Sequence, residues 1–288
     1  MLLEHLKKIN PKFVEFLEQE ILNSEGLPIG TKIVGVETGD YIFSGGTSTS
    51  KEKALRIAIA ESFERSLVEF IYNSVELAEK FMMKDFPSSS GFAAGFDNDS
   101  TKFRAICEGL ERWAWSKWID ENYQIDIVQP LMKLNTLTMK MLSEFSDTLW
   151  LRKDFEITID NKKMNLSLSI FLGFTEHGIF PGSRVSTIND DLFEHPVIEA
   201  HRNFLNSKLK SVSTIQSIDI IHKRLMYFSN HQQEALSQIR NAKRTSWPNP
   251  ELCLLKNLET NIPGVFLWRC LFKNFIGWHL GNEDRFVY

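Results

Sequence analysis

Two stretches of the sequence share the pattern Glu-x-x-Glu-Arg, whose side chains could hold cations or pair with one another. The first stretch reads ALRIAIAESFERS and the second reads TKFRAICEGLERW. The charged positions of the two patterns are Glu61, Glu64, Arg65, Glu108, Glu111 and Arg112. A single pattern of this kind is most often an exposed ion pair on a helix, worth about 0.2–0.5 kcal/mol.

The neighbours of these glutamates favour a buried position over an exposed one. Ala54, Ala58 and Glu61 follow one another at steps of three or four residues, so they share one face of a predicted helix. Thr101, Ala105 and Glu108 form a comparable stripe on the next predicted helix. A carboxylate beside a buried stripe must be paired, hydrogen-bonded or metal-bound. Oxygen ligands without His or Cys point to Mg²⁺, which usually comes with phosphate.

A third stretch, PVIEAHRNF, places Glu199 and Arg202 three residues apart. Small-residue stretches precede all three acidic helices, and we expect them to be loops; they read SGGTSTS, SSSGFAAG and PGSRVST. Backbone amides in such loops, next to helix N-termini, bind anions well. The sequence therefore predicts a nucleotide site with carboxylate-held magnesium. It contains neither a P-loop nor a GxGxxG motif.

These blocks resemble the signatures of the YcaO-domain family. SSGFAAG at 89–95 and EGLER at 108–112 are similar to the second signature of that family, and STSKEKALRIAIAESFERS is similar to the first. GSRVSTINDDLFEHPVIEAHR is similar to the third, more weakly. The resemblance covers blocks at about 44–66, 88–113 and 182–203 of the chain.

The resemblance implies an α+β fold, with β-sheets packed against long helices and a nucleotide site between the acidic helices. We expect one YcaO-like domain over residues 1–288, without a separate domain for recognising a leader peptide. The implied activity is ATP- and Mg²⁺-dependent activation of a peptide backbone amide. A nucleophile adds to the amide carbonyl, the oxygen is phosphorylated, and phosphate leaves. The product is an azoline, a thioamide or an amidine in a ribosomal precursor peptide.

Site residues follow from the resemblance position by position. The implied magnesium ligands are Glu61, Glu64, Glu108, Glu111 and Glu199. The implied catalytic residues are Glu108, Glu111 and Arg112. The implied nucleotide-binding residues are Ser48, Ser89, Ser90, Gly91, Arg112, His195 and Arg202. His195 has an alternative interpretation as a helix-start residue just before Pro196.

Several positions depart from the family pattern and keep other interpretations open. Thr47 stands where a lysine is expected, Phe96 where a polar residue is common, and Ser100 where an acidic residue is frequent. The end of the chain, GNEDRFVY, lacks the proline-rich tail of azoline-forming members. One alternative is a degenerate member that serves as a scaffold or peptide-binding subunit. A second alternative is that the Glu-x-x-Glu-Arg patterns form purely structural ion pairs.

The composition limits the kinds of binding partner and the cellular location that we expect. A net charge of −4 argues against a general nucleic-acid binder. No uncharged apolar run is long enough to cross a membrane, and the three scattered cysteines indicate a reducing compartment, so we expect a cytoplasmic protein. The expected partners are the precursor peptide, a protein for leader recognition or sulfur delivery, and a second copy in a homodimer. Trp113, Trp115 and Trp118 could line a peptide groove, although core or dimer packing is commoner.

The element pattern is mixed α and β. Asn10-Pro11 predicts the start of a helix that runs to about residue 22, and Thr38-Gly39-Asp40 predicts a hairpin turn. A hairpin around Asp160-Asn161 is the clearest β signal in the chain. The remaining predicted elements are helices at 51–83, 100–119, 196–208 and 215–243, a helix led by Pro130, and strands at 124–128 and 264–272.

Overall fold

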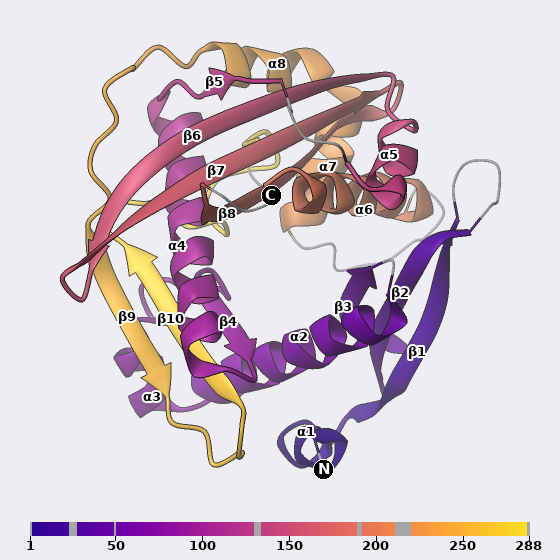
Figure 1. Ribbon diagram of the computed structural model, residues 1–288, viewed down its shortest axis with the longest axis vertical. Coiled ribbons are helices and arrows are strands. Elements are labelled where there is room, and N and C mark those ends of the chain that lie inside the picture. The colour runs from indigo at the N-terminus through magenta and orange to yellow at the C-terminus, as the bar shows by residue number, and fades with distance from the viewer. Residues whose placement is uncertain are drawn as a thin grey trace. The chain divides into compact units, whose positions relative to one another are not determined.

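The computed structural model describes residues 2–22, 28–48, 50–129, 134–188, 192–210 and 220–286. The chain forms two compact units, whose elements are labelled in Figure 1. Unit 1 comprises Met1–Gly109 and Cys253–Leu271, and unit 2 comprises Leu110–Leu252 and Phe272–Tyr288. The α4 helix, Asn98–Glu121, contributes residues to both units.

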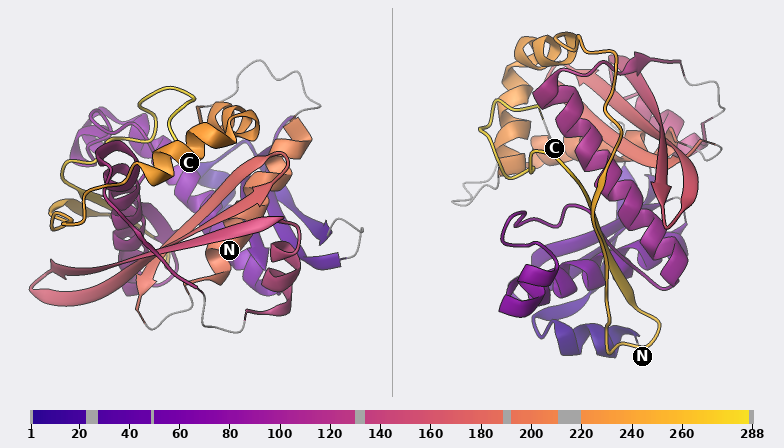
Figure 2. Two further views of the ribbon diagram at one scale, coloured as in Figure 1. Left: turned by 90° about the horizontal axis from the view of Figure 1, so that it is seen from above. Right: turned by 90° about the vertical axis from the view of Figure 1, so that its left-hand side faces the viewer.

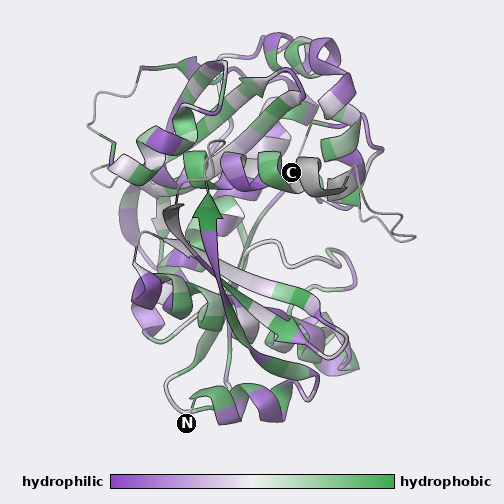
Figure 3. Ribbon diagram, turned by 90° about the vertical axis from the view of Figure 1, so that its right-hand side faces the viewer, coloured by the Kyte–Doolittle hydropathy of each residue, from purple (hydrophilic) through white to green (hydrophobic). Residues whose placement is uncertain are grey.

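Unit 1 begins with a short helix and an antiparallel sheet of order β1-β2-β3. Its elements are α1 Leu2–Ile9, β1 Phe13–Leu22, β2 Pro28–Glu37 and β3 Tyr41–Ser48. The helix α1 shows apolar and polar bands in Figure 3, and Leu6 is its buried residue. The predicted turn between β2 and β3 is confirmed, since Gly39 and Asp40 have φ of 83° and 58°.

The prediction of a helix from Asn10 to residue 22 is wrong. The side chain of Asn10 accepts a hydrogen bond from the Lys12 N–H at 3.2 Å and donates one to Glu37 at 2.8 Å. This arrangement turns the chain out of α1 and into β1. The β1 strand is rich in β-branched and aromatic residues at its start and pairs with β2 along its length. Sheet pairing therefore overrides the helix-start signal.

The α2 helix, Lys51–Tyr72, packs against this sheet by contacting β2 and β3, and the short α3 helix, Val75–Lys80, follows it. The predicted single helix at 51–83 is thus interrupted, because the Ser74 side chain caps a new helix by accepting the Leu77 N–H. Phe63, Leu67 and Ile71 of α2 belong to the buried core of unit 1.

A second antiparallel sheet, of order β4-β10-β9, lies almost wholly in unit 1. Its strands are β4 Phe92–Gly95, β9 Leu252–Leu258 and β10 Phe266–Phe272, and β10 confirms the late strand predicted from the sequence. The neighbouring β9 and β10 run side by side in Figure 2. β4 pairs with β10 from Phe92 to Gly95, so β4 is an edge strand.

Unit 2 is built on a sheet of order β5-β6-β7-β8. Its strands are β5 Asp126–Ile127, β6 Asp147–Ile159, β7 Lys162–Thr175 and β8 Gly178–Thr187. The β6–β7 hairpin was predicted, and its turn residues Asp160 and Asn161 have positive φ of 52° and 60°. The long hairpin is prominent in Figure 1.

The helices of unit 2 differ in extent from the predicted ones. They are α5 Thr136–Leu142, α6 Glu194–Lys210, α7 Ile220–Asn230 and α8 Gln232–Arg240. The start of the helix predicted at Pro130 lies outside the described residues, and α5 begins instead after the Asn135 cap. The predicted helix at 215–243 is divided at His231, and its first five residues lie outside the described part.

Aromatic residues dominate the core of unit 2. Trp113, Trp115 and Trp118 are each at most 2% exposed, so they are core residues and do not line a peptide groove. Trp113 packs against Phe155 and Trp247 with ring centroids 5.9 and 6.0 Å apart. Among the described residues, no helix is both long enough and apolar enough to span a membrane.

Candidate functional site

The three acidic helices each follow a strand, which corrects the predicted loops at 44–48 and 181–187, whereas the predicted loop at 88–95 is correct for residues 88–91. Residues 44–48 belong to β3, residues 92–95 to β4, and residues 181–187 to β8. α2, α4 and α6 follow these strands. The repeated sequence pattern is therefore a strand–helix unit, in which most of the small residues stand in the strand.

Glycines in two of these strands allow the following helix to approach closely. A Cβ at Gly46 of β3 would lie 2.1 Å from the Ala54 carbonyl oxygen of α2. A Cβ at Gly182 of β8 would lie 2.0 Å from the Pro196 carbonyl oxygen of α6. Both distances are far below contact, so only glycine fits. The small residues at these positions serve close packing of helix on strand, and this packing brings the glutamates to the strand edge.

The glutamates of α2 bind backbone N–H groups of unit 1. Glu61 accepts the Gly45 N–H of β3 at 2.9 Å and pairs with Arg65 at 2.8 Å. Glu64 accepts the Ala94 N–H of β4 at 3.2 Å. The Ala94 carbonyl in turn accepts a hydrogen bond from Arg104 at 2.7 Å. Both polar groups of Ala94 are thus satisfied by side chains.

Negative charge accumulates around Glu64. Burial, together with the neighbouring carboxylates of Glu108 and Glu61, raises the pKa of Glu64 from 4.5 to about 8. The opposing influences of Arg104 and the Ala94 N–H are weaker. Glu64 therefore carries a proton at neutral pH, and an arriving cation would favour its ionised form. We call Glu61, Glu64 and Glu108 the unit 1 carboxylates.

In unit 2, Glu111 and Glu199 bind the edge of β8. Glu111 is 8% exposed and accepts hydrogen bonds from the Ser183 hydroxyl at 2.8 Å and the Val185 N–H at 3.2 Å. Glu199 accepts the Ser183 N–H at 2.8 Å. Ser183 thereby links both carboxylates, and its hydroxyl also accepts the Trp115 indole N–H at 2.9 Å. We call Glu111 and Glu199 the unit 2 carboxylates.

One structural rule covers these contacts. β3, β4 and β8 are each the terminal strand of a sheet, and a terminal strand presents N–H groups that no further strand can bind. Glutamates from the helices accept these N–H groups, and a hydrogen bond to a charged group is worth about 1.5–3 kcal/mol. A carboxylate has about four acceptor positions, so one so held can also bind a cation.

The basic residues that we expected to contact nucleotide phosphates differ from one another in their surroundings. Arg112 lies with its guanidinium carbon 3.3 Å from the ring centroid of Trp278. Arg202 pairs with Glu199 at 3.3 Å on a half-exposed surface. His195 is exposed in the first turn of α6, which begins at Glu194 and accommodates Pro196 because first-turn N–H groups have no helical acceptor.

The serine-rich turn before β4 is built around a buried arginine that sequence reasoning did not place. Arg269 of β10 is 0% exposed, and its guanidinium donates to the carbonyl oxygens of Phe81, Phe86, Ser88 and Ser90. Burial lowers the pKa of Arg269 to about 9, so it remains charged at neutral pH. Gly91 has φ of 77°, and a Cβ there would lie 1.9 Å from the Cys270 carbonyl oxygen. This glycine is required by the backbone of β10.

The predicted nucleotide-binding serines lie in unit 1, two of them in the turn before β4 and one at the end of β3. Ser89 is exposed in the turn before β4, whereas Ser90 is buried there. Ser48 is buried at the end of β3 and accepts the Ser50 N–H at 3.2 Å. Ser48 therefore shapes the turn that leads into α2.

The helix starts of unit 1 are capped by the chain itself. Asp97 accepts the Ser100 N–H at 2.8 Å and the Ser100 hydroxyl at 2.6 Å, and these hydrogen bonds lower the pKa of Asp97. Ser50 caps α2 by accepting the Lys53 N–H. The side chains of Asp97 and Ser50 thus accept backbone N–H groups at helix starts, where the sequence predicted that such groups would bind an anion.

The family departures also have structural explanations. Phe96 packs on the core of unit 1, edge to face with Phe63 at a centroid distance of 6.3 Å. Ser100 makes the Asp97 cap described above. Thr47 is a half-buried residue of β3 opposite Lys32 of β2.

The carboxylate oxygens of the candidate site match the chemistry of a hard cation. Within the described ranges, no group of three His, Cys, Asp or Glu side chains is already arranged to hold a metal ion. Two features support the fit: the neighbouring carboxylates that raise the pKa of Glu64, and the strand N–H groups that orient four of the five glutamates. These are oxygen ligands of the type that Mg²⁺ prefers.

Comparison with known proteins gives the fold. No family model and no curated protein matches the sequence. A YcaO protein from Methanopyrus kandleri, bound with AMPPCP and Mg²⁺, superposes with a TM-score of 0.57 at 12% identity, covering 94% of this chain and 90% of that one. The E. coli microcin synthetase McbBCD complex with pro-MccB17 bound gives 0.60 at 11% identity, covering 93% and 91%.

A heterocyclase in complex with substrate and cofactor gives a TM-score of 0.56 at 10% identity, covering 95% of this chain and 52% of that one. All three similarities extend over more than nine tenths of this chain. The protein combines antiparallel sheets with helices packed on them, so it is a mixed α and β protein, as predicted. The fold is that of the YcaO proteins, which confirms the resemblance at the level of structure.

Proposed function

We propose that this chain binds ATP and Mg²⁺ and activates a backbone amide of a ribosomal precursor peptide. The observation that carries the proposal is the set of glutamates held on edge strands of a YcaO fold. A solved neighbour with this fold holds AMPPCP and Mg²⁺, and another is the microcin synthetase McbBCD complex with pro-MccB17 bound.

Bound ATP would supply the phosphoryl group that makes the amide oxygen a leaving group, and Mg²⁺ would neutralise its phosphates. The unit 1 and unit 2 carboxylates would hold the Mg²⁺ ions. Backbone N–H groups of Gly45, Ala94 and Ser183 would keep three of these side chains in place during turnover. Glu64 would lose its proton when a cation binds, because the cation offsets the repulsion from Glu108 and Glu61.

Arg112 is the residue we propose for contact with the phosphates. A guanidinium presents several N–H donors in one plane and matches phosphate geometry. In the reaction, a nucleophile forms a bond to the amide carbon, and the resulting oxyanion takes the γ-phosphoryl group from ATP, releasing ADP. Cleavage of the C–O bond then expels phosphate that carries the former amide oxygen. A Cys, Ser or Thr side chain as nucleophile gives an azoline, an amine gives an amidine, and sulfide gives a thioamide.

The test is peptide modification in a reconstituted reaction. The purified chain would be incubated with ATP, Mg²⁺ and each short peptide encoded beside its gene, with and without the proteins encoded there. Mass spectrometry should show loss of one water or exchange of oxygen for sulfur, together with ADP release. Glu111→Gln should stop both, whereas Glu69→Gln, an exposed change on α2, should not.

The alternatives give different results in the same reaction. A scaffold or peptide-binding subunit would bind the peptide without modification and without ADP release, and that outcome would contradict the proposed activity. Purely structural ion pairs would make Glu111→Gln lower the unfolding temperature while turnover by the folded fraction continues.

A further inference from the structure

Arg104 is a basic residue of unit 1 that lies among the unit 1 carboxylates. It stands four residues before Glu108 on α4, so the two side chains leave the same face of the helix. Its Nη2 donates to the Ala94 carbonyl oxygen at 2.7 Å, and the N–H of Ala94 donates to Glu64 at 3.2 Å. One residue of the edge strand β4 therefore brings a guanidinium and a carboxyl group together.

The close approach of α4 to β4 depends on Gly95. A Cβ there would lie 2.4 Å from the Thr101 hydroxyl oxygen and 3.7 Å from Nη1 of Arg104. The first turns of α4 therefore lie against the edge strand, and they carry the guanidinium with them. The positive charge of Arg104 lowers the pKa of Glu64, against the larger effects of burial and the neighbouring carboxylates. Arg104 is thus within electrostatic reach of a predicted magnesium ligand.

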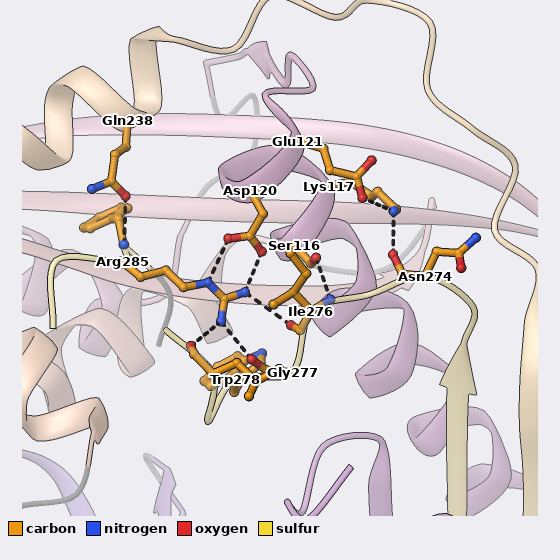
Figure 4. Close-up of polar contacts among 12 residues, drawn as sticks. Ser116, Lys117, Asp120, Glu121, Gln238, Asn274, Ile276, Gly277, Trp278 and Arg285 are labelled. Carbon is orange, nitrogen blue, oxygen red and sulfur yellow. Dashed lines mark hydrogen bonds and ion pairs between the residues drawn. The ribbon is translucent and has the colours of Figure 1, made fainter. Parts of the chain in front are cut away.

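Arginines with a structural role in this protein use several of their donors. Arg285 donates to Asp120 and to carbonyl oxygens near the C-terminus, among them that of Gly277 at 2.8 Å (Figure 4). Arg269 is 0% exposed and donates to four carbonyl oxygens. The side chain of Arg104 is instead exposed, and within the described residues a single hydrogen bond holds it. Most of its N–H donors therefore remain for a ligand.

We propose that Arg104 binds a phosphate of the nucleotide whose Mg²⁺ the unit 1 carboxylates hold. This inference rests on the proposed function, because that function brings a magnesium-bound nucleotide to these carboxylates. A phosphate that shares Mg²⁺ with Glu64 and Glu108 comes within reach of a guanidinium placed beside them. The Ala94 carbonyl orients one edge of the guanidinium, and the remaining donors in its plane match the oxygens of a phosphate.

The test compares Arg104→Met with Arg104→Lys in calorimetric titrations with ATP and Mg²⁺ at low and high salt. Arg104→Met should weaken ATP binding about tenfold or more, because a hydrogen bond to a charged group is lost. Arg104→Lys keeps the charge without the planar donors, so its affinity should lie between those of Arg104→Met and the wild type. Arg240→Met makes the same change at an exposed position of α8 in unit 2 and should leave ATP binding unchanged.

The salt dependence separates a phosphate contact from a structural role. Salt screens the attraction between an exposed guanidinium and a phosphate. Raising the NaCl concentration from about 0.05 M to about 0.3 M should therefore weaken ATP binding less in Arg104→Met than in the wild type. Both Arg104 variants should keep the wild-type circular dichroism spectrum, because the side chain is exposed. If Arg104→Met does not fold, the same comparison is made with Arg104→Lys, whose affinity should still be below that of the wild type.

Two results would overturn the inference. The first is wild-type ATP affinity in the folded Arg104 variants, which would leave the proposed function standing and remove only the role of Arg104. The second is a loss of affinity in Arg104→Met with the same salt dependence as the wild type, because Arg104 would then act only through the Ala94 carbonyl on the position of β4. A wild-type chain that binds no ATP would instead refute the proposed function, and the inference with it.

Discussion

Glu64 should make the stability of this protein fall as pH rises through neutrality. Burial and the carboxylates of Glu108 and Glu61 raise its pKa from 4.5 to about 8. Between these two values, the folded state binds a proton that the unfolded state does not, so the free energy of unfolding decreases with pH. The slope from one such group is about 1.4 kcal/mol per pH unit, which gives about 2 kcal/mol between pH 6 and 7.5.

The assay is urea unfolding of the wild type and Glu64→Gln at pH 6, 7 and 7.5. Glutamine has no proton to lose, so this variant should lack the pH slope that Glu64 contributes. The free energy of unfolding of the variant should therefore rise relative to that of the wild type by about 2 kcal/mol between pH 6 and 7.5. Glu108→Gln should lower the pKa of Glu64 and move the slope to lower pH. Glu69→Gln on the exposed surface of α2 is the matched control. Equal slopes in the wild type and Glu64→Gln would refute the reasoning.

Three further changes test the strand–helix units and their anchors. Gly46→Ala should destabilise the fold by about 1–3 kcal/mol, because the new Cβ would meet the Ala54 carbonyl oxygen at 2.1 Å. Gly45→Ala, whose new Cβ would have its nearest contact at 3.5 Å, should lower the stability much less. Equal midpoints of thermal unfolding for the two variants would contradict this prediction. Arg269→Met should lower the free energy of unfolding in urea by about 3 kcal/mol or more, because it leaves four carbonyl oxygens without their donor. Arg269→Lys should not fully retain the wild-type stability. An Arg269→Met variant as stable as the wild type would contradict this prediction. Ser183→Ala should lower the free energy of unfolding by about 1–2 kcal/mol and weaken Mg²⁺-dependent ATP binding, because Glu111 and Trp115 both lose a hydrogen-bond partner. Unchanged ATP affinity in binding calorimetry would show that Ser183 does not position Glu111.

The sequence allowed prediction of the helices that carry the glutamates, because their apolar spacing and neighbouring caps are local signals. It also predicted the Asp160-Asn161 turn, since two residues at positive φ favour these side chains. The local sequence before α6 predicts a loop, because its glycine and serines are typical turn residues. Pairing of β8 with β7 makes it a strand, and that pairing is not visible in local sequence.

The partners of the candidate site residues were harder to predict. Ser183 lies in the small-residue stretch PGSRVST, but its two carboxylate contacts depend on β8 being the sheet edge. Trp278 and Arg269 lie more than 150 residues from the segments they contact, at separations that periodicity cannot detect. The same limit explains Asn10, where a contact to Glu37 decided between a helix start and a turn into a strand.

The central claim is that carboxylates held on strand edges bind magnesium and ATP. The most direct measurement is a calorimetric titration of the wild-type chain with ATP in the presence of Mg²⁺, repeated with excess EDTA. We expect saturable binding that disappears with EDTA and in Glu108→Gln and Glu111→Gln, while both variants keep the wild-type circular dichroism spectrum. Absence of binding by the folded wild type, or equal binding with and without Mg²⁺, would contradict the claim.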